Sequence, residues 1–207
     1  ETYVLGSLAA RRFGLLELSI DSLVRLSRRT EDASFISVRR GTYAVCLYRE
    51  EGTFPIRTHA LQAGFEHPLG CGAGSLALLA ALTDEEVEAV LAANEAVLKA
   101  EYPLLPPERI RADIAEAREK GYSLNPGLIV PNSWGIGAVV RYPDGMPAGA
   151  LSIAAIDSRM QPARQKELGT LLIEEAGRVE KKVAQMFASR VRSPEGSGER
   201  FQGRKER

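Results

Sequence analysis

The residues best suited to chemistry in this chain lie between Phe65 and Leu82, in the segment FEHPLGCGAGSLALLAAL. An extended lead-in ends at Pro68, glycines follow at every second position from Gly70 to Gly74, and an apolar helix is predicted directly after them. Glycines allow backbone N–H groups to come close to a bound molecule, and a helix N-terminus favours a negative charge. The pattern is typical either of a cradle for a small acid or of a tight strand-to-helix turn, and both interpretations stay open at this point.

Imidazole and thiol groups near this turn could bind a metal ion or react with oxidants. His59, His67 and Cys71 offer ligands, but the spacing from His67 to Cys71 crosses a turn, so we expect no metal site. Cys71 at a predicted helix N-terminus could have a lowered thiol pKa and react with oxidants, which makes a cysteine-based redox sensor or enzyme one alternative function. Such chemistry needs a second thiol close by, and Cys46 is the only other cysteine in the sequence.

Other catalytic patterns are absent from the sequence. No Ser–His–Asp order, paired-carboxylate motif or phosphate-binding loop stands out, and the GCGAG run lacks the strand–helix–strand context of a dinucleotide site. We therefore expect no catalytic residues and no cofactor, and the sequence does not predict an enzyme.

Composition narrows the class of protein further. Lys plus Arg equals Asp plus Glu at 27 each among 207 residues, and a chain with zero net charge is a poor ligand for a phosphate backbone. A hydrophobic content of 44% is enough for a sizeable core. No apolar run is long enough to cross a membrane, and two separated cysteines are typical of a reduced, cytoplasmic setting.

The predicted elements that surround the glycine turn begin with a helix over 7–30. Period-two alternation follows over 34–41, 43–52 and 53–61, which predicts three consecutive antiparallel strands. After the turn we expect a buried helix over 73–82, a second helix that starts with the capping box Thr83–Glu86, and a third between Pro107 and Gly121.

The last part of the chain predicts a strand or extended loop over 122–130 and a hairpin over 136–156 around Pro143–Gly145. A final helix is expected over 165–187, and the polar, Gly- and Ser-rich residues from 190 onward predict disorder. Strands in both halves, with helices grouped between and around them, favour an α+β fold in which helices flank an antiparallel sheet.

Four short signatures occur in order along this chain. They are YVLG at 3–6, PL at 68–69 with the small-residue turn and ALLA at 77–80, IR at 110–111 leading to KGYS at 120–123, and ALSI at 150–153. Together they resemble the C-terminal effector-binding domain of the isocitrate lyase regulator (IclR) family of bacterial transcription factors, over about residues 3–188. The resemblance implies a GAF/PAS-like α+β sensor fold, without enzymatic activity, that binds a small-molecule effector.

The resemblance also implies a domain organisation. Residues 1–30 would be a linker and signalling helix, 31–189 the effector-binding domain and 190–207 a disordered tail. An N-terminal winged helix-turn-helix DNA-binding domain, absent from this chain, would precede Glu1. The expected partners are a small-molecule effector, further copies in a homodimer or tetramer, and operator DNA reached only through the missing domain. No membrane is expected among them.

Part of a ligand site is implied as well. Family members that bind small carboxylic acids hold the carboxylate on the backbone N–H groups of a Gly–Ala pair, which matches Gly72 and Ala73 here. Two serines alternate along the family's strand that matches ALSIA, and the first of them is Ser152 in this chain. Alternate residues of a strand share one face of the sheet, so this hydroxyl would face the ligand.

Three positions depart from the family's pattern and change the expected ligand. Asn125 replaces an acidic residue, Gly135 a polar one and Ala154 the second serine, while Trp134 flanks Gly135 and predicts an aromatic wall. Because unpaired polar groups are costly to bury, we expect an acid with an aromatic or extended apolar body rather than glyoxylate or pyruvate. Two alternatives stay open: Trp134 could belong to the core or an interface, and the domain could be a dimerisation module with a degenerate pocket.

Overall fold

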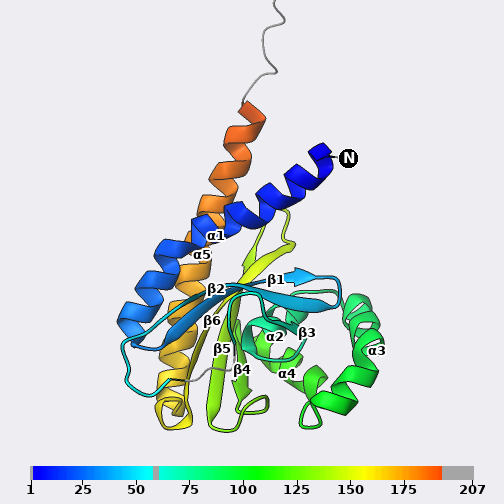
Figure 1. Ribbon diagram of the computed structural model, residues 1–207, viewed down its shortest axis with the longest axis vertical. Helices are drawn as coiled ribbons and strands as arrows, with labels where there is room; N and C mark the ends of the chain where they lie inside the picture. Colours follow the sequence, from blue (N-terminus) through cyan, green and yellow to red (C-terminus); the bar gives the residue numbers. More distant parts are fainter. Residues whose placement is uncertain (1, 58–60, 193–207) are drawn as a thin grey trace, which may run out of the picture.

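Helices cover both faces of one antiparallel sheet (Figure 1). The computed structural model describes residues 2–57 and 61–192. The strands are β1 (Ala33–Arg40), β2 (Tyr43–Glu50), β3 (Glu66–Pro68), β4 (Ser123–Pro126), β5 (Ser133–Arg141) and β6 (Pro147–Ile156). The helices are α1 (Thr2–Thr30), α2 (Ala73–Ala80), α3 (Asp84–Glu101), α4 (Pro107–Lys120) and α5 (Pro162–Arg192), with the short 3-10 turn η1 (Asp157–Arg159) before α5. This arrangement confirms the predicted α+β fold.

The order of the strands in the sheet is β3-β2-β1-β6-β5-β4, and neighbouring strands run antiparallel. The first and last strands, β1 and β6, lie side by side in its middle, with Phe35 opposite Ser152. This non-local pair joins the two halves of the chain into one sheet, and it decides which residues of β1 stand beside those of β6.

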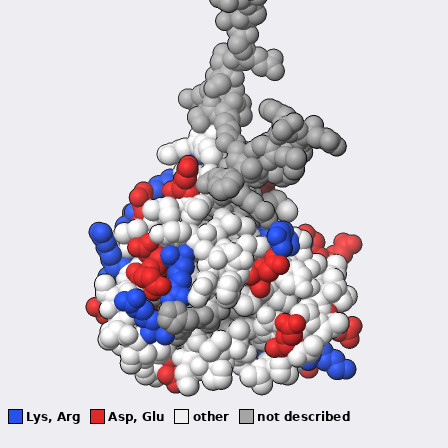
Figure 2. Space-filling model, in the orientation of Figure 1, with Lys and Arg blue, Asp and Glu red and all other residues white. Residues whose placement is uncertain are grey.

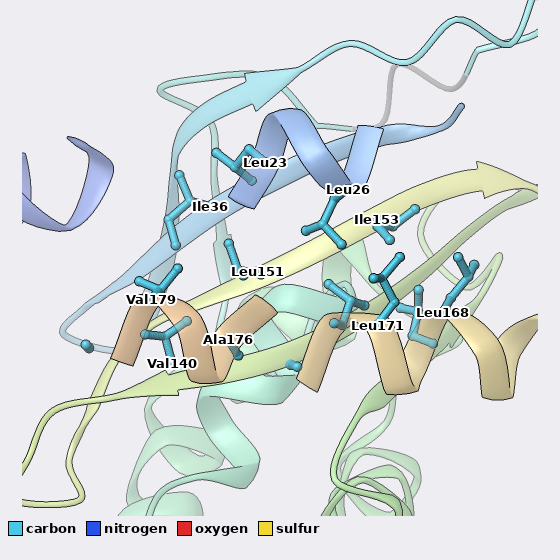
Figure 3. Packing of buried hydrophobic residues seen from close by; sticks show 14 of the residues in the cluster. Leu23, Leu26, Ile36, Val140, Leu151, Ile153, Leu168, Leu171, Ala176 and Val179 are labelled. Atoms are coloured by element: carbon cyan, nitrogen blue, oxygen red, sulfur yellow. The ribbon is translucent and has the colours of Figure 1, made fainter. Parts of the chain in front are cut away.

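One face of the sheet packs against α1 and α5 (Figure 3). The largest hydrophobic cluster lies there and includes Leu23 and Leu26 of α1, Ile36 of β1, and Leu171 and Val179 of α5. Each such side chain contributes about 1.5–3 kcal/mol when it is fully buried. The helix period of α5 and the period of two in the strands therefore direct apolar residues toward each other across this layer.

The opposite face carries α2, with α4 packed against α2 and α3 farther out. As predicted, α3 begins with a capping box: the N–H of Glu86 donates to Thr83 Oγ1, and the N–H of Thr83 donates to Glu86 Oε2, both at 3.3 Å. Likewise α4 begins at Pro107 and ends at Lys120, and Gly121 follows with a φ of 77°, the left-handed conformation of a helix C-cap.

A buried carboxylate ties the end of α1 to the start of α5. Asp32 accepts hydrogen bonds from Arg159 Nε at 3.0 Å and from Arg164 Nη2 at 2.7 Å. Both arginines also donate to the backbone carbonyl of Thr30, and the guanidinium carbon of Arg159 lies 3.8 Å from the centre of the Phe54 ring. These contacts hold the α1–β1 turn, η1 and the segment after β2 together.

Two sequence-based predictions about element boundaries were wrong. No strand forms over the described part of 53–61; Phe54 stacks on Arg159 instead, and the short β3 pairs with β2 in its place. The last helix begins at Pro162 and continues to Arg192, beyond the predicted 165–187. His59 and residues 193–207 of the predicted tail lie outside the described residues.

Charges of both signs lie side by side on the visible face of the molecule, in keeping with its zero net charge (Figure 2). Within the described residues, no helix combines the length and apolar character that crossing a bilayer requires.

Candidate functional site

The glycine turn leads from β3 into α2 and leaves the start of α2 open. Ser75 Oγ accepts a hydrogen bond from the N–H of Gly70 at 3.1 Å and donates to the carbonyl of Pro68 at 3.0 Å, which closes the turn. Gly72, at φ 83°, is the N-cap of α2 and has no side chain with which to cap it. The N–H groups in the first turn of α2, from Ala73 on, therefore lack a side-chain cap and remain able to bind an anion.

Small residues allow the first turn of α2 to lie directly on the sheet. A Cβ at Gly137 of β5 would stand 2.9 Å from the carbonyl carbon and oxygen of Ala73, and a Cβ at Gly74 would stand 3.1 Å from Ser152 Oγ. Ser123 Oγ donates to the carbonyl of Ala73 at 2.6 Å and so fixes the helix to β4. The N-terminus of α2 is thus held against β4, β5 and β6 by close contacts.

A cavity of about 630 Å³, counting the space at its open mouth, lies at this helix N-terminus. The seven residues predicted for ligand binding all line it: Gly72, Ala73, Asn125, Trp134, Gly135, Ser152 and Ala154. The register of the sheet explains why they meet, because Asn125, Gly135 and Ala154 are paired across β4, β5 and β6. Their role in binding a ligand stays a prediction.

The polar groups in the cavity wall are neutral. Asn125 Oδ1 accepts a hydrogen bond from the N–H of Leu128 at 3.2 Å, which leaves the side-chain NH₂ group as a donor. Ser152 is 5% exposed, and its hydroxyl has no hydrogen-bond partner among the described residues. None of the described residues that line the cavity is Lys, Arg, Asp or Glu. The first turn of α2 is therefore the part of this wall best suited to a negative charge.

The aromatic wall comes mainly from a residue that sequence reasoning missed. Gly135 faces Ala73, so strand alternation directs the side chain of its neighbour Trp134 to the other face of the sheet, where it packs against the α5-side cluster. Trp134 does line the cavity, yet it also belongs to the core, as the alternative interpretation held. Phe35 of β1, 2% exposed and opposite Ser152, supplies an aromatic ring on the cavity face.

Further lining residues come from α2, from the strands β1, β2, β3, β5 and β6, and from the connecting segments. They are Ser37, Ala44, Cys46, Leu61, His67, Cys71, Gly74, Ser75, Ile129, Ser133 and Ile153. Phe35 and Ser37 are two positions apart in β1 and therefore lie on the same face of the sheet. A hairpin with its turn at Gly41 predicts that Ser37 pairs with Cys46, and the structure has this pairing. The sequence therefore could have indicated that these residues of β1 and β2 share a face, but it could not indicate that β6 lies on the other side of β1.

The two thiols are poor nucleophiles in these surroundings. Burial raises the pKa of Cys71 to about 12. Burial is also the main cause of the raised pKa of Cys46, which is about 11. The expectation of a lowered pKa at Cys71 was wrong, because desolvation of the thiolate outweighs the helix N-terminus beside it. Both cysteines are thiols at neutral pH, which removes the main support for the redox alternative.

His67 is an uncharged wall residue. Burial lowers its pKa below the ordinary 6.5, and its Nδ1 lies 3.1 Å from the hydroxyl of Tyr102. Among the described residues, no group of three His, Cys, Asp or Glu side chains is arranged to hold a metal ion.

Comparison with known proteins agrees with this fold. The family model of the bacterial transcriptional regulator IclR C-terminal domain matches residues 8–181, so the chain belongs to the IclR family of transcriptional regulators, which are not enzymes. It is 24% identical over 178 residues to the HTH-type transcriptional regulator KipR of Bacillus subtilis, covering 86% of this chain and 71% of KipR.

Solved structures of the family show the same fold. The Thermotoga maritima IclR structure matches with a TM-score of 0.75 at 20% identity, over 88% of this chain and 73% of that one. An IclR transcriptional regulator from Alicyclobacillus acidocaldarius matches with a TM-score of 0.74 at 21% identity, over 87% of this chain and 72% of the other. The family and the α+β fold expected from the four signatures are thereby confirmed.

Proposed function

We propose that this domain senses a small organic acid, whose carboxylate binds the first turn of α2 and whose body lies against the sheet. The observation that carries the proposal is the uncapped start of α2, which opens into a cavity lined by neutral groups. Backbone N–H groups at a helix N-terminus bind an anion without a cationic side chain. Seven residues from four separate segments, expected from sequence to line a ligand site, line this one cavity.

The wall chemistry favours one carboxylate and an apolar body. Phe35, Leu61, Ile129 and Ala154 present apolar surface, whereas the free donors and acceptors are few, chiefly the Asn125 amide and the Ser152 hydroxyl. A second carboxylate on the ligand would enter a wall without a cation and would have no partner for its charge. The proposed effector is therefore a monocarboxylate with an aromatic or extended apolar body.

The proposed role in the whole protein is to pass ligand binding to DNA. We infer that residues 31–189 bind the effector, that residues 1–30 link them to an N-terminal DNA-binding domain, and that the protein acts as a dimer or tetramer. A ligand can shift the arrangement of such an assembly only by the difference between its affinities for the two arrangements. The contacts of Asp32 between α1 and α5 lie directly before β1, three residues from Phe35 in the cavity wall.

Isothermal titration of the 207-residue protein with phenylacetate, hexanoate, pyruvate and glyoxylate tests this function. We expect phenylacetate or hexanoate to bind at least about ten-fold more tightly than pyruvate, because their bodies bury more apolar surface. Gly135→Ser should weaken binding, since a Cβ there would lie 3.1 Å from the Cβ of Ala73, a tight contact, and would bring the added side chain beside the Ala73 N–H. Ser152→Ala should remove one hydrogen bond.

Ser158→Ala is the matched control, because Ser158 is exposed in η1 and does not line the cavity. Binding that is equally weakened by all three variants would count against the assigned site. If none of the four acids binds while the protein still forms oligomers, the sensing function is wrong and a dimerisation module with a degenerate pocket is favoured instead.

A further inference from the structure

A second cavity, of about 550 Å³ with its open mouth, lies where α4, the edge strand β4 and the start of α5 meet. Figure 1 shows β4 next to α4, with α5 on the other side of the sheet. Its walls include Arg109, Asp113, Glu116 and Lys120 of α4, Tyr122 beside β4 and Trp134 of β5. Charged residues thus form one side of the cavity, and aromatic and apolar residues form the other.

The aromatic side is held in place by packing. A Cβ at Gly169 of α5 would stand 2.4 Å from two carbons of the Tyr122 ring, so only glycine there allows this ring to lie against α5. Trp134 is paired with Pro126 across the edge of the sheet, and its side chain packs against the α5-side cluster. A flat ring entering the cavity would therefore meet aromatic surfaces that are already ordered.

The charged side carries two cations and two anions along one face of α4. Arg109, Asp113, Glu116 and Lys120 follow each other at helical spacing, and Arg109 Nε donates to Asp113 Oδ1 at 2.8 Å while Lys120 pairs with Glu116. The cation of each pair reaches solvent, with Arg109 43% and Lys120 39% exposed, whereas the Asp113 side chain is 11% exposed. Ion pairs that reach solvent in this way are weak and exchange for other partners.

This balance of charge selects between ligands. A ligand with a single charge would take one member of an ion pair and leave the other member without a partner. A zwitterion would replace an ion pair inside the protein by two between protein and ligand, so every charge stays paired. Charge-assisted hydrogen bonds to a carboxylate also favour the guanidinium of Arg109, whose planar fork can donate two of them.

We propose that the second cavity binds a small aromatic zwitterion of the aromatic α-amino acid class. The ring lies against Tyr122 and Trp134, the carboxylate binds Arg109, and the ammonium group binds Asp113. This site lies between α4 and the start of α5 at the sheet edge and does not depend on the function proposed for the first cavity.

Titration calorimetry with L-phenylalanine tests the proposal, alongside three compounds that each lack one feature: 3-phenylpropionate, 2-phenylethylamine and L-alanine. We expect the binding that Arg109→Gln weakens to be at least about ten-fold tighter for L-phenylalanine than for each of the three, because each loses one ion pair or the ring contact. 3-Phenylpropionate, a monocarboxylate, is also expected in the first cavity, where Arg109→Gln should leave its binding unchanged. Trp134 is the only tryptophan in the chain, so its fluorescence, which phenylalanine does not obscure, should change on binding.

Variants assign the binding to one cavity. Arg109→Gln and Asp113→Asn should each weaken L-phenylalanine binding about ten-fold. Arg111→Gln is the matched control, because Arg111 lies on the same helix but pairs with Glu88 and does not line the cavity. Ser152→Ala in the first cavity should also leave the binding unchanged. Failure of L-phenylalanine to bind would overturn the proposal, and so would binding that Ser152→Ala abolishes but Arg109→Gln preserves.

Discussion

The close packing of α2 against the sheet depends most directly on Gly137 of β5. A Cβ built at this position would lie 2.9 Å from the carbonyl carbon and oxygen of Ala73 and 3.0 Å from the N atom of Gly74. All three are backbone atoms of the first turn of α2, so no side chain can rotate away to make room. Gly137→Ala should therefore displace the start of α2 from the sheet.

The size of the effect follows from these distances. Carbon atoms in contact lie best at about 3.5–4.0 Å, so α2 would have to move away by about 0.6 Å or more. Overpacking of this kind costs about 1–3 kcal/mol. Ala in place of Gly also restricts the unfolded chain, which by itself favours folding by about 0.4–1 kcal/mol. We expect a net loss of about 1–2 kcal/mol in the free energy of unfolding.

Urea denaturation measures this loss, and titration with the acid that binds best to the unaltered protein measures the effect on the cavity. Binding should weaken, because the first-turn N–H groups of α2 move together with Ala73. Gly177→Ala is the control, since a Cβ at this helical position meets nothing within 4 Å and should stabilise the protein by about 0.5–1 kcal/mol. If Gly137→Ala leaves both stability and affinity unchanged, α2 does not rest on β5 as described, and the reasoning about the cavity fails.

Three other predictions concern buried groups. Asp32→Asn should lower the free energy of unfolding by about 3–5 kcal/mol in urea denaturation, because it leaves two part-buried guanidinium groups without their carboxylate. Cys46 and Cys71, whose pKa values are raised by burial, should resist iodoacetamide at neutral pH in the folded protein and both react in urea, as mass spectrometry would show. Burial alone would raise the pKa of Glu175, but hydrogen bonds from Arg25 and Ser22 lower it below 4.5. The contribution of ionised Glu175 to the stability of the fold is therefore fully present above about pH 4.5, and it is lost as the pH falls through the lowered pKa. Glu175→Gln should reduce this acid-side loss of stability.

Each of these has an outcome that contradicts it. Glu88→Gln removes an exposed ion pair and should cost less than about 1 kcal/mol, so an Asp32→Asn loss of similar size would mean that the buried carboxylate matters no more than a surface one. Rapid alkylation of either cysteine in the folded protein would show a reactive thiolate. An unchanged pH profile in Glu175→Gln would show that this carboxyl titrates normally.

Local chemistry made several elements predictable. The capping box at Thr83 and the glycine at 121 satisfy backbone groups within a few residues of themselves, and the proline at 107 has no N–H that needs a partner. The start of α3 and both ends of α4 therefore follow from the chain alone. The same holds for the hairpin of β5 and β6, whose turn contains Pro143 and Gly145. The prediction of a strand over 53–61 was wrong because alternation over a few residues is weak evidence for a strand. In the structure the Phe54 ring packs against the guanidinium of Arg159, which is far away in the sequence.

The sequence by itself determined the glycine turn, the start of a helix directly after it and the seven positions to examine for a ligand. The tertiary structure decided what surrounds that turn. Pairing of β1 with β6 placed Phe35 beside Ser152, and strand alternation turned the Trp134 side chain toward α5. Burial then raised the pKa of Cys71, although its place in the sequence suggested the opposite. The physical reason is the same in each case: a helix cap acts over one turn, whereas the faces of a sheet and the desolvation of a thiol depend on residues far away in the chain.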